Sequence, residues 1–393
     1  MSWRPKASLT RDEALALHRQ AMVIDSKFPG SLSVPSSRVK GLFENELGRL
    51  GSGTYRQAIY SKVKALAVEE LWSDDSVRTS YLDVWDRAGL TAGLVSTVGV
   101  HPDGEVAYAD AIRNMASEVY APVLSSSGKI RVAVRSQDIE DAHRSGEHAL
   151  IIGWENSTPL GSDLGRIDMF HSFGVRSVQL TYNMRNLVGD GCMEPSGSGL
   201  TRFGGALIDR LNEKRMIVDV SHGSEALILD AAKASARPIS MNHTGARSVY
   251  RYDRNASDEA MKAVAGTGGY VGIYVVAAFL QPNDEGTLDQ WADHVEHIAR
   301  LIGVDKVGIG CDSGDIYQVP PARADFQSHY PPTYPWHGFT AAHRTQFTEF
   351  DRYRTMLDWP NLTAQLAARG FNEDEIRGVI GRNYLNFFRE VVG

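Results

Sequence analysis

Eight short runs of apolar residues recur along the chain, and longer stretches with helical periodicity separate them. Most runs are near-continuous and rich in β-branched residues, which is typical of parallel strands buried on both faces. Eight such strands alternating with helices predict a (β/α)8 barrel or a doubly wound sheet. No GxGxxG follows the first strand and no P-loop occurs, which weakens the case for a nucleotide-binding doubly wound sheet. The expected strands are residues 21–25, 92–97, 149–154, 177–181, 216–220, 238–242, 270–275 and 307–310.

The remaining segments fit the same plan, and we predict one barrel domain over residues 1–393. Helices are expected at 200–214, 224–234, 258–266 and 288–302, and two more within 357–392, where Asn361 and Asn372 look like N-caps. Insertions at about 31–75 and 317–345 follow the first and last strands. Because loops after barrel strands form the catalytic face, the second insertion is expected to wall the pocket, with a plain surface loop as the alternative.

Charge and cysteine content exclude several classes of protein. The net charge of -7 gives no basic footprint for nucleic acid. Two cysteines, Cys192 and Cys311, are too few for a disulfide framework. No apolar signal segment follows the N-terminus and no stretch of about 18 apolar residues occurs, so we expect neither secretion nor a membrane partner. A cytoplasmic protein acting on a small molecule is the resulting expectation.

Polar residues end four of the expected strands. Glu155 ends the third, His222 the fifth, His243 the sixth and Asp312 the eighth. The carboxyl ends of barrel strands carry the catalytic residues, so these side chains are expected at one rim. Each alone has an ordinary explanation, as a hydrogen-bonded histidine or a rim salt bridge. Two imidazoles and two carboxylates together predict a site for a metal such as zinc.

Several short motifs resemble the membrane (renal) dipeptidase family, peptidase M19, of amidohydrolase type. The resemblance covers roughly residues 14–388, and its motifs are specific as a set although each is short. The matching segments are 177–183 with Asn186, 199–204, 219–222, 242–243, 254–259, 303–312, 360–363 and 381–385.

The resemblance implies a role for each rim residue. Glu155 is implied as a carboxylate that bridges two zinc ions, and His222 and His243 as ligands of the second ion. Asp312 is implied as the carboxylate that binds the first metal and transfers the proton, and Arg254, followed by Asn255, as a residue that binds substrate.

The first strand departs from the family pattern. The family ends this strand in a His-x-Asp pair, whereas Lys27 and Pro29 stand at those positions here. Neither residue is an ordinary ligand, so we predict one metal, held by Glu155, His222 and His243, rather than two, with a metal-free protein as the alternative. Three interpretations of Lys27 stay open: an ammonium that replaces the missing cation and pairs with Glu155 and Asp312, a catalytic acid or Schiff-base lysine, or a side chain that points elsewhere.

Tyr182 is a second departure, because the family has a histidine there that is thought to stabilise the oxyanion. A phenol can also donate one hydrogen bond, so Tyr182 is a candidate catalytic and substrate-binding residue. This variation resembles a bacterial branch of the family, in which peptidase activity is less secure.

Three functions follow as hypotheses. The first is a metal-dependent hydrolase of a small amide such as a dipeptide or dehydropeptide. The second is a diverged enzyme that uses Lys27 in non-peptidase, metal-independent chemistry on a biosynthetic metabolite. The third is a non-catalytic barrel. A homodimer is expected by analogy only.

Overall fold

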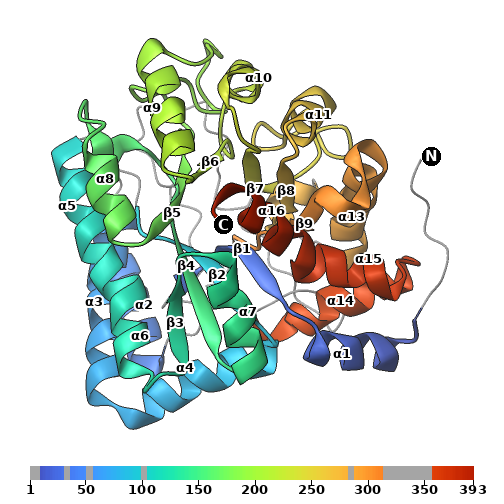
Figure 1. The fold of residues 1–393 in the computed structure, drawn as a ribbon. Coiled ribbons are helices and arrows are strands. Elements are labelled where there is room, and N and C mark those ends of the chain that lie inside the picture. The colour runs from blue at the N-terminus through green and yellow to red at the C-terminus, as the bar shows by residue number, and fades with distance from the viewer. Residues whose placement is uncertain (1–8, 31–35, 50–55, 99–103, 282–286, 313–355) are drawn as a thin grey trace.

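Nine parallel strands form the centre of the computed structural model, which describes residues 9–30, 36–49, 56–98, 104–281, 287–312 and 356–393 (Figure 1). Eight of them follow one another in the order β1-β2-β4-β5-β6-β7-β8-β9. The strands are β1 (Ile24–Phe28), β2 (Ala92–Ser96), β3 (Ile130–Ala133), β4 (His148–Trp154), β5 (Val175–Gln179), β6 (Ile217–Asp219), β7 (Ser240–Thr244), β8 (Tyr270–Ile273) and β9 (Val307–Ile309).

The two ends of this row meet. The backbone N–H of Asp312, just after β9, donates to the carbonyl of Lys27 in β1 over 3.0 Å. The Ser26 hydroxyl of β1 also donates to the carbonyl of Ile309 in β9 over 3.0 Å. The chain therefore forms the predicted (β/α)8 barrel, and all eight predicted strands are present.

The ninth strand, β3, is absent from the sequence prediction. It pairs with the first half of β4, where Ile130 lies opposite His148 and Ala133 opposite Ile151. The second half of β4 pairs with β5. β3 is thus an addition beside the barrel row, and its four residues are too few to show a pattern.

Helices surround the strands in Figure 1. All four helices predicted between strands are present as α9, α10, α11 and α13, and the hydroxyls of Thr201, Ser224 and Ser257 cap the first three. No helix in the described ranges is long and apolar enough to cross a membrane. The helices are α1 (Arg11–Gln20), α2 (Ser37–Arg49), α3 (Arg56–Ser73), α4 (Asp75–Ala88), α5 (Gly104–Met115), α6 (Ala121–Ser125), α7 (Ser136–Ser145), α8 (Arg166–Ser172), α9 (Arg202–Glu213), α10 (Glu225–Ala234), α11 (Asp258–Gly266), α12 (Ala277–Leu280), α13 (Leu288–Ile302), α14 (Trp359–Ala368), α15 (Glu373–Arg377) and α16 (Asn383–Val391).

The first insertion is mostly helical. Within residues 31–75 lie α2 and α3, and α3 is tied to the segment after α5 by an ion pair of 3.1 Å between Lys64 and the buried Glu118. The second insertion, 317–345, lies outside the described residues.

The C-terminal segment confirms one predicted cap and corrects the other. Asn372 caps α15, and its side chain accepts from the backbone N–H of Glu375. Asn361 is not an N-cap, because α14 already begins at Trp359 with Asp358 before it. Pro360 lies in the first turn of α14, where its fixed φ angle suits a helix start and its missing N–H costs nothing.

Helix α16 fills the amino-terminal end of the barrel. Tyr384, Phe387 and Phe388 pack against apolar residues near the beginnings of several strands, including Ile24 and Tyr270. This end is therefore a closed apolar core, and the opposite, carboxyl end is left to carry the polar side chains.

Candidate active site

The four polar residues predicted at strand ends do meet at one rim. Glu155 directly follows β4, His222 follows β6, His243 lies in β7 and Asp312 follows β9. His243 Nε2 lies 3.5 Å from Glu155 Oε1 and 4.0 Å from Asp312 Oδ2. Parallel strands in a barrel place their carboxyl ends together, so residues far apart in the sequence become neighbours here.

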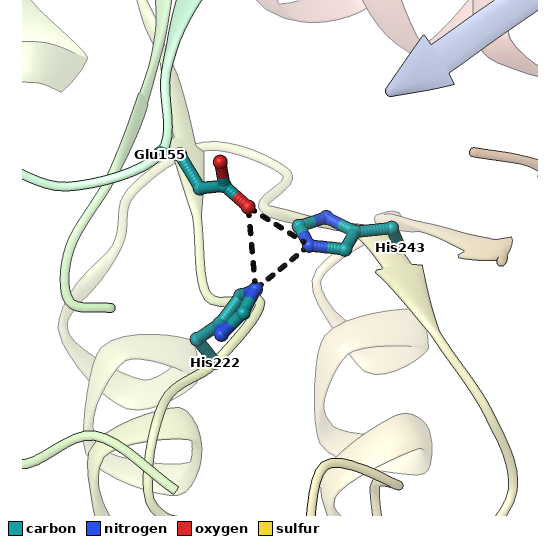
Figure 2. Close-up of side chains that lie close together, drawn as sticks. All are labelled: Glu155, His222 and His243. Atoms are coloured by element: carbon teal, nitrogen blue, oxygen red, sulfur yellow. Dashed lines mark hydrogen bonds and ion pairs between the residues drawn. The ribbon is translucent and has the colours of Figure 1, made fainter. Parts of the chain in front are cut away.

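Glu155, His222 and His243 form a compact triad with the spacing of a metal site (Figure 2). His222 Nε2 lies 2.9 Å from His243 Nε2 and 3.4 Å from Glu155 Oε1. Tetrahedral zinc with bonds of about 2.0–2.2 Å requires ligand atoms roughly 3.4 Å apart. The three donor atoms therefore fit one zinc ion with little movement.

Both imidazoles direct an unprotonated nitrogen at the centre of this triad. His222 Nδ1 contacts Asn183 Oδ1, and His243 Nδ1 contacts Asn242 Oδ1. An amide oxygen only accepts, so each Nδ1 carries the proton and each Nε2 presents a lone pair. Burial, together with the charge of Arg254, lowers the pKa of His222 to about 3 and that of His243 well below its ordinary value. Two facing lone pairs beside a carboxylate repel one another unless a cation lies between them, so this arrangement fits a metal ion.

Asn183 is a positioning residue that the sequence reasoning did not single out, although it lies in one of the quoted motifs. We expect Asn183→Leu to weaken zinc binding about 10- to 100-fold, the typical effect of losing a partner that orients a ligand. Zinc titration against a competing chelator measures this change. Asn386→Leu, a change at an exposed position of α16, is the control and should leave affinity unchanged; equal affinity in both variants would contradict the role of Asn183.

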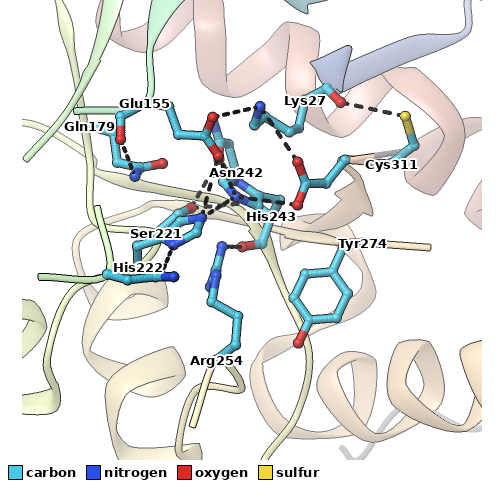
Figure 3. Close-up of polar contacts among 12 residues, drawn as sticks. Lys27, Glu155, Gln179, Ser221, His222, Asn242, His243, Arg254, Tyr274 and Cys311 are labelled. Atoms are coloured by element: carbon cyan, nitrogen blue, oxygen red, sulfur yellow. Dashed lines mark hydrogen bonds and ion pairs between the residues drawn. The ribbon is translucent and has the colours of Figure 1, made fainter. Parts of the chain in front are cut away.

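Lys27 contacts the carboxylate oxygen of Glu155 that does not face the two imidazoles (Figure 3). Its ammonium is 3.1 Å from Glu155 Oε2 and 3.5 Å from Asp312 Oδ1, and its side chain is only 10% exposed. Burial disfavours the charged amine, yet the two carboxylates outweigh this and raise the pKa of Lys27 above its ordinary value. The interpretation that Lys27 points elsewhere is therefore wrong, and the ion pairing of the first interpretation is observed.

Asp25 holds the strand that carries Lys27. Its Oδ1 accepts from the backbone N–H groups of Lys27 and Cys311, each over 2.9 Å, and its Oδ2 accepts from the Cys311 thiol over 2.6 Å. The two bonds to Cys311 join β1 to the residue just before Asp312. The positions of Lys27 and Asp312 are thus fixed together at the place where the barrel closes.

Two rim residues adopt unusual backbone conformations. His222 has a φ of 63° and Asp312 a φ of 51°, in the left-handed region that non-glycine residues rarely occupy. Such strain persists where the surroundings enforce it and is common at functional sites.

Burial raises the pKa of Asp312 to about 6, with the Lys27 charge opposing this shift and the Glu155 charge adding to it.

Three further candidate residues border the triad. The Tyr182 ring stacks on His222 with centroids 4.3 Å apart. The buried Arg254 guanidinium donates to the His243 carbonyl over 3.0 Å. Asn255 instead joins its own loop to α12: its amide donates to the carbonyls of Tyr250 and Phe279, each over 2.8 Å. Contact of any of the three with substrate stays a prediction, and Asn255 would have to give up a bond to make it.

A family model described as membrane dipeptidase, peptidase family M19, matches residues 87–331. The matched span contains Glu155, His222, His243 and Asp312, whereas Lys27 lies before it.

Individual relatives extend this comparison. Dipeptidase verJ from Clonostachys rogersoniana is 27% identical over 269 residues, which make up 67% of this chain and 61% of that protein. The match thus spans less than two thirds of that relative. A solved amidohydrolase from Pseudomonas aeruginosa shares 24% identity with a TM-score of 0.71, over 98% of this chain and 100% of its own. A metallo peptidase from Rhodobacter sphaeroides, liganded with a phosphinate mimic of the dipeptide L-Ala-D-Ala, shares 19% identity with a TM-score of 0.68, over 94% and 99%. These structural likenesses establish the barrel fold.

Proposed function

Because the chain belongs to the membrane dipeptidase family, peptidase family M19, we propose that it is a metal-dependent hydrolase of small amides with one metal ion. One observation carries the proposal: the Nε2 lone pairs of His222 and His243 and the Oε1 atom of Glu155 converge at zinc-ligand spacing. The dipeptidase relative and the solved metallo peptidase with its dipeptide mimic support a dipeptide or dehydropeptide as the kind of amide.

In this proposal Glu155, His222 and His243 hold a single zinc ion. A bound zinc ion supplies a Lewis acid that polarises the scissile carbonyl and lowers the pKa of water. Lys27 takes the place of a second cation, because its ammonium already neutralises the outer oxygen of Glu155 and one oxygen of Asp312. A second metal would have to displace this ammonium, whose partners among the described residues are the two carboxylates Glu155 and Asp312.

The chain's own groups supply the remaining steps. Asp312 accepts the proton of the attacking water and delivers it to the leaving nitrogen. This role requires a carboxylate close to the triad, and Asp312 Oδ2 lies 4.0 Å from His243 Nε2. Arg254 binds the substrate carboxylate through its guanidinium. The Tyr182 hydroxyl donates to the developing oxyanion, and the stacking of its ring on His222 positions it.

The electrostatics around Lys27 disfavour one form of the second hypothesis, a Schiff-base lysine. A nucleophilic lysine must be neutral, which requires a lowered pKa. The pKa of Lys27 is raised instead, because Glu155 and Asp312 hold the proton on it. Lys27 thus serves as a fixed charge in our proposal.

Chelation tests the proposed function. We expect chelator-treated protein to lose at least 100-fold in amide hydrolysis, an effect comparable to the loss of a strong electrostatic stabiliser. One equivalent of zinc should restore the rate. The substrate panel should contain free dipeptides and N-acyl amino acids of both alanine enantiomers. An undiminished rate in stripped protein would support the metal-independent alternative, and no turnover at any zinc content would support the non-catalytic barrel.

A further inference from the structure

The two carboxylates at this rim, Glu155 and Asp312, are already neutralised by a cation of the protein, the Lys27 ammonium. Lys27 Nζ lies 3.1 Å from Glu155 and 3.5 Å from Asp312, and Figure 3 shows the ammonium directed at Glu155. The second oxygen of Glu155 faces the two imidazoles. A positively charged substrate group that approaches Glu155 or Asp312 therefore meets a carboxylate that already has Lys27 as its partner.

Lys27 cannot easily move aside for such a group. It is buried in β1, its N–H donates to Asp25 over 2.9 Å, and its carbonyl accepts from Asp312 over 3.0 Å. A buried ammonium that loses its carboxylate partners is costly, so the ion pairs hold it in place. Lys27 is a built-in positive charge of the pocket.

Arg254 adds a second positive charge nearby. Its guanidinium is buried and contacts the carbonyl of His243, a triad residue. Among the described residues its buried Nε atom has no hydrogen-bond partner. Together with a divalent ion on the triad, Lys27 and Arg254 outweigh the negative charges of Glu155, Asp312 and Asp253, which lines the same pocket as His222 and Arg254 in the described part of the chain. Such a pocket favours an anionic ligand and disfavours a second ammonium.

We propose that Lys27 is a specificity-determining residue and that the substrate is an N-acyl amino acid: an amide that carries a carboxylate and no free α-ammonium group. This inference rests on the proposed amide hydrolysis and favours an N-acyl amino acid over a free dipeptide as its substrate. In a free dipeptide the α-ammonium is attached to the carbon next to the scissile carbonyl, so it must enter the positive region around Lys27 and the metal. An N-acyl amino acid places an uncharged group there and keeps the carboxylate for Arg254.

A matched pair of substrates isolates this one charge. Glycyl-alanine and propionyl-alanine differ only by an ammonium in place of a methyl group, and each is tested with L- and D-alanine. For the zinc-loaded protein we expect kcat/KM to be at least tenfold higher for propionyl-alanine. A higher value for glycyl-alanine would overturn the inference while leaving the proposed hydrolase intact.

Variants at Lys27 separate charge from structure. Lys27→Met should reduce the ratio of the two kcat/KM values at least tenfold, because it removes the repelling charge and exposes two carboxylates to the substrate ammonium. Lys27→Arg keeps the charge and should keep the preference, whereas an unchanged ratio in Lys27→Met would overturn the role of Lys27.

If neither compound is hydrolysed, the proposed function fails. Calorimetric binding then still decides the inference: tighter binding of propionyl-alanine supports it, and equal or weaker binding overturns it.

Discussion

His222→Ala is expected to remove both zinc binding and hydrolysis. The change deletes one of three ligands, so zinc affinity should fall by more than the 10- to 100-fold that loss of an orienting partner typically costs. His243 and Glu155 would remain as two ligands, too few to hold zinc against solvent. Zinc titration and amide hydrolysis in the same samples measure both effects.

His171→Ala provides the matched control for this change. His171 is a partly exposed histidine of α8, and its loss should leave zinc affinity and rate unaltered. Circular dichroism of both variants checks that the barrel is intact. Activity and zinc affinity that persist in folded His222→Ala would mean that other residues hold the metal.

Lys27→Met is expected to destabilise the metal-free protein by about 3–5 kcal/mol at pH 7, the usual effect of removing one partner of a buried ion pair. Glu155 and Asp312, both partly buried, would lose the ammonium that pairs with each of them. Denaturant unfolding in the presence of chelator measures the change. Lys233→Met, at an exposed lysine of α10, should change the free energy of unfolding by less than about 0.5 kcal/mol.

The difference between wild type and Lys27→Met should depend on pH. Burial alone would raise the pKa of Glu155, but the charge of Lys27 outweighs it and lowers that pKa well below the ordinary value. A carboxylate with a lowered folded pKa stabilises the fold above its unfolded pKa, and this contribution is lost as the pH falls. Because the pKa of Lys27 is raised, Lys27 stabilises the fold in full at every pH below the pKa of an ordinary lysine. The gap should therefore be full near pH 7 and narrow towards pH 4; a gap that stays constant would show that packing, not charge, is lost.

Much of the barrel could be predicted because its strands carry strong local signals. The run Ile151-Ile152-Gly153-Trp154 is apolar throughout, as a strand buried on both faces must be. β3 could not be predicted in this way, because it is short and depends on pairing with half of β4. The sequence prediction starts α14 too late, after Asn361, because Pro360 in the first turn is a stronger start signal than the asparagine that follows it.

The site was predictable in its residue types and not in its orientations. Barrel geometry alone brings Glu155, His222, His243 and Asp312 to one rim, so their positions at strand ends were sufficient. The direction of Lys27 depends on how β1 closes against β9 through Asp25 and Cys311, which are 286 residues apart. The tautomer of His222 likewise depends on Asn183, 39 residues earlier in the chain. Contacts of this kind leave no local pattern in a sequence.

The number of zinc ions per chain tests the central claim most directly. Elemental mass spectrometry on protein purified without chelator should give about one zinc per chain. Two ions per chain would contradict the assignment of Lys27 as the second positive charge of the site. No zinc, even after incubation with the metal, would contradict the metallohydrolase itself.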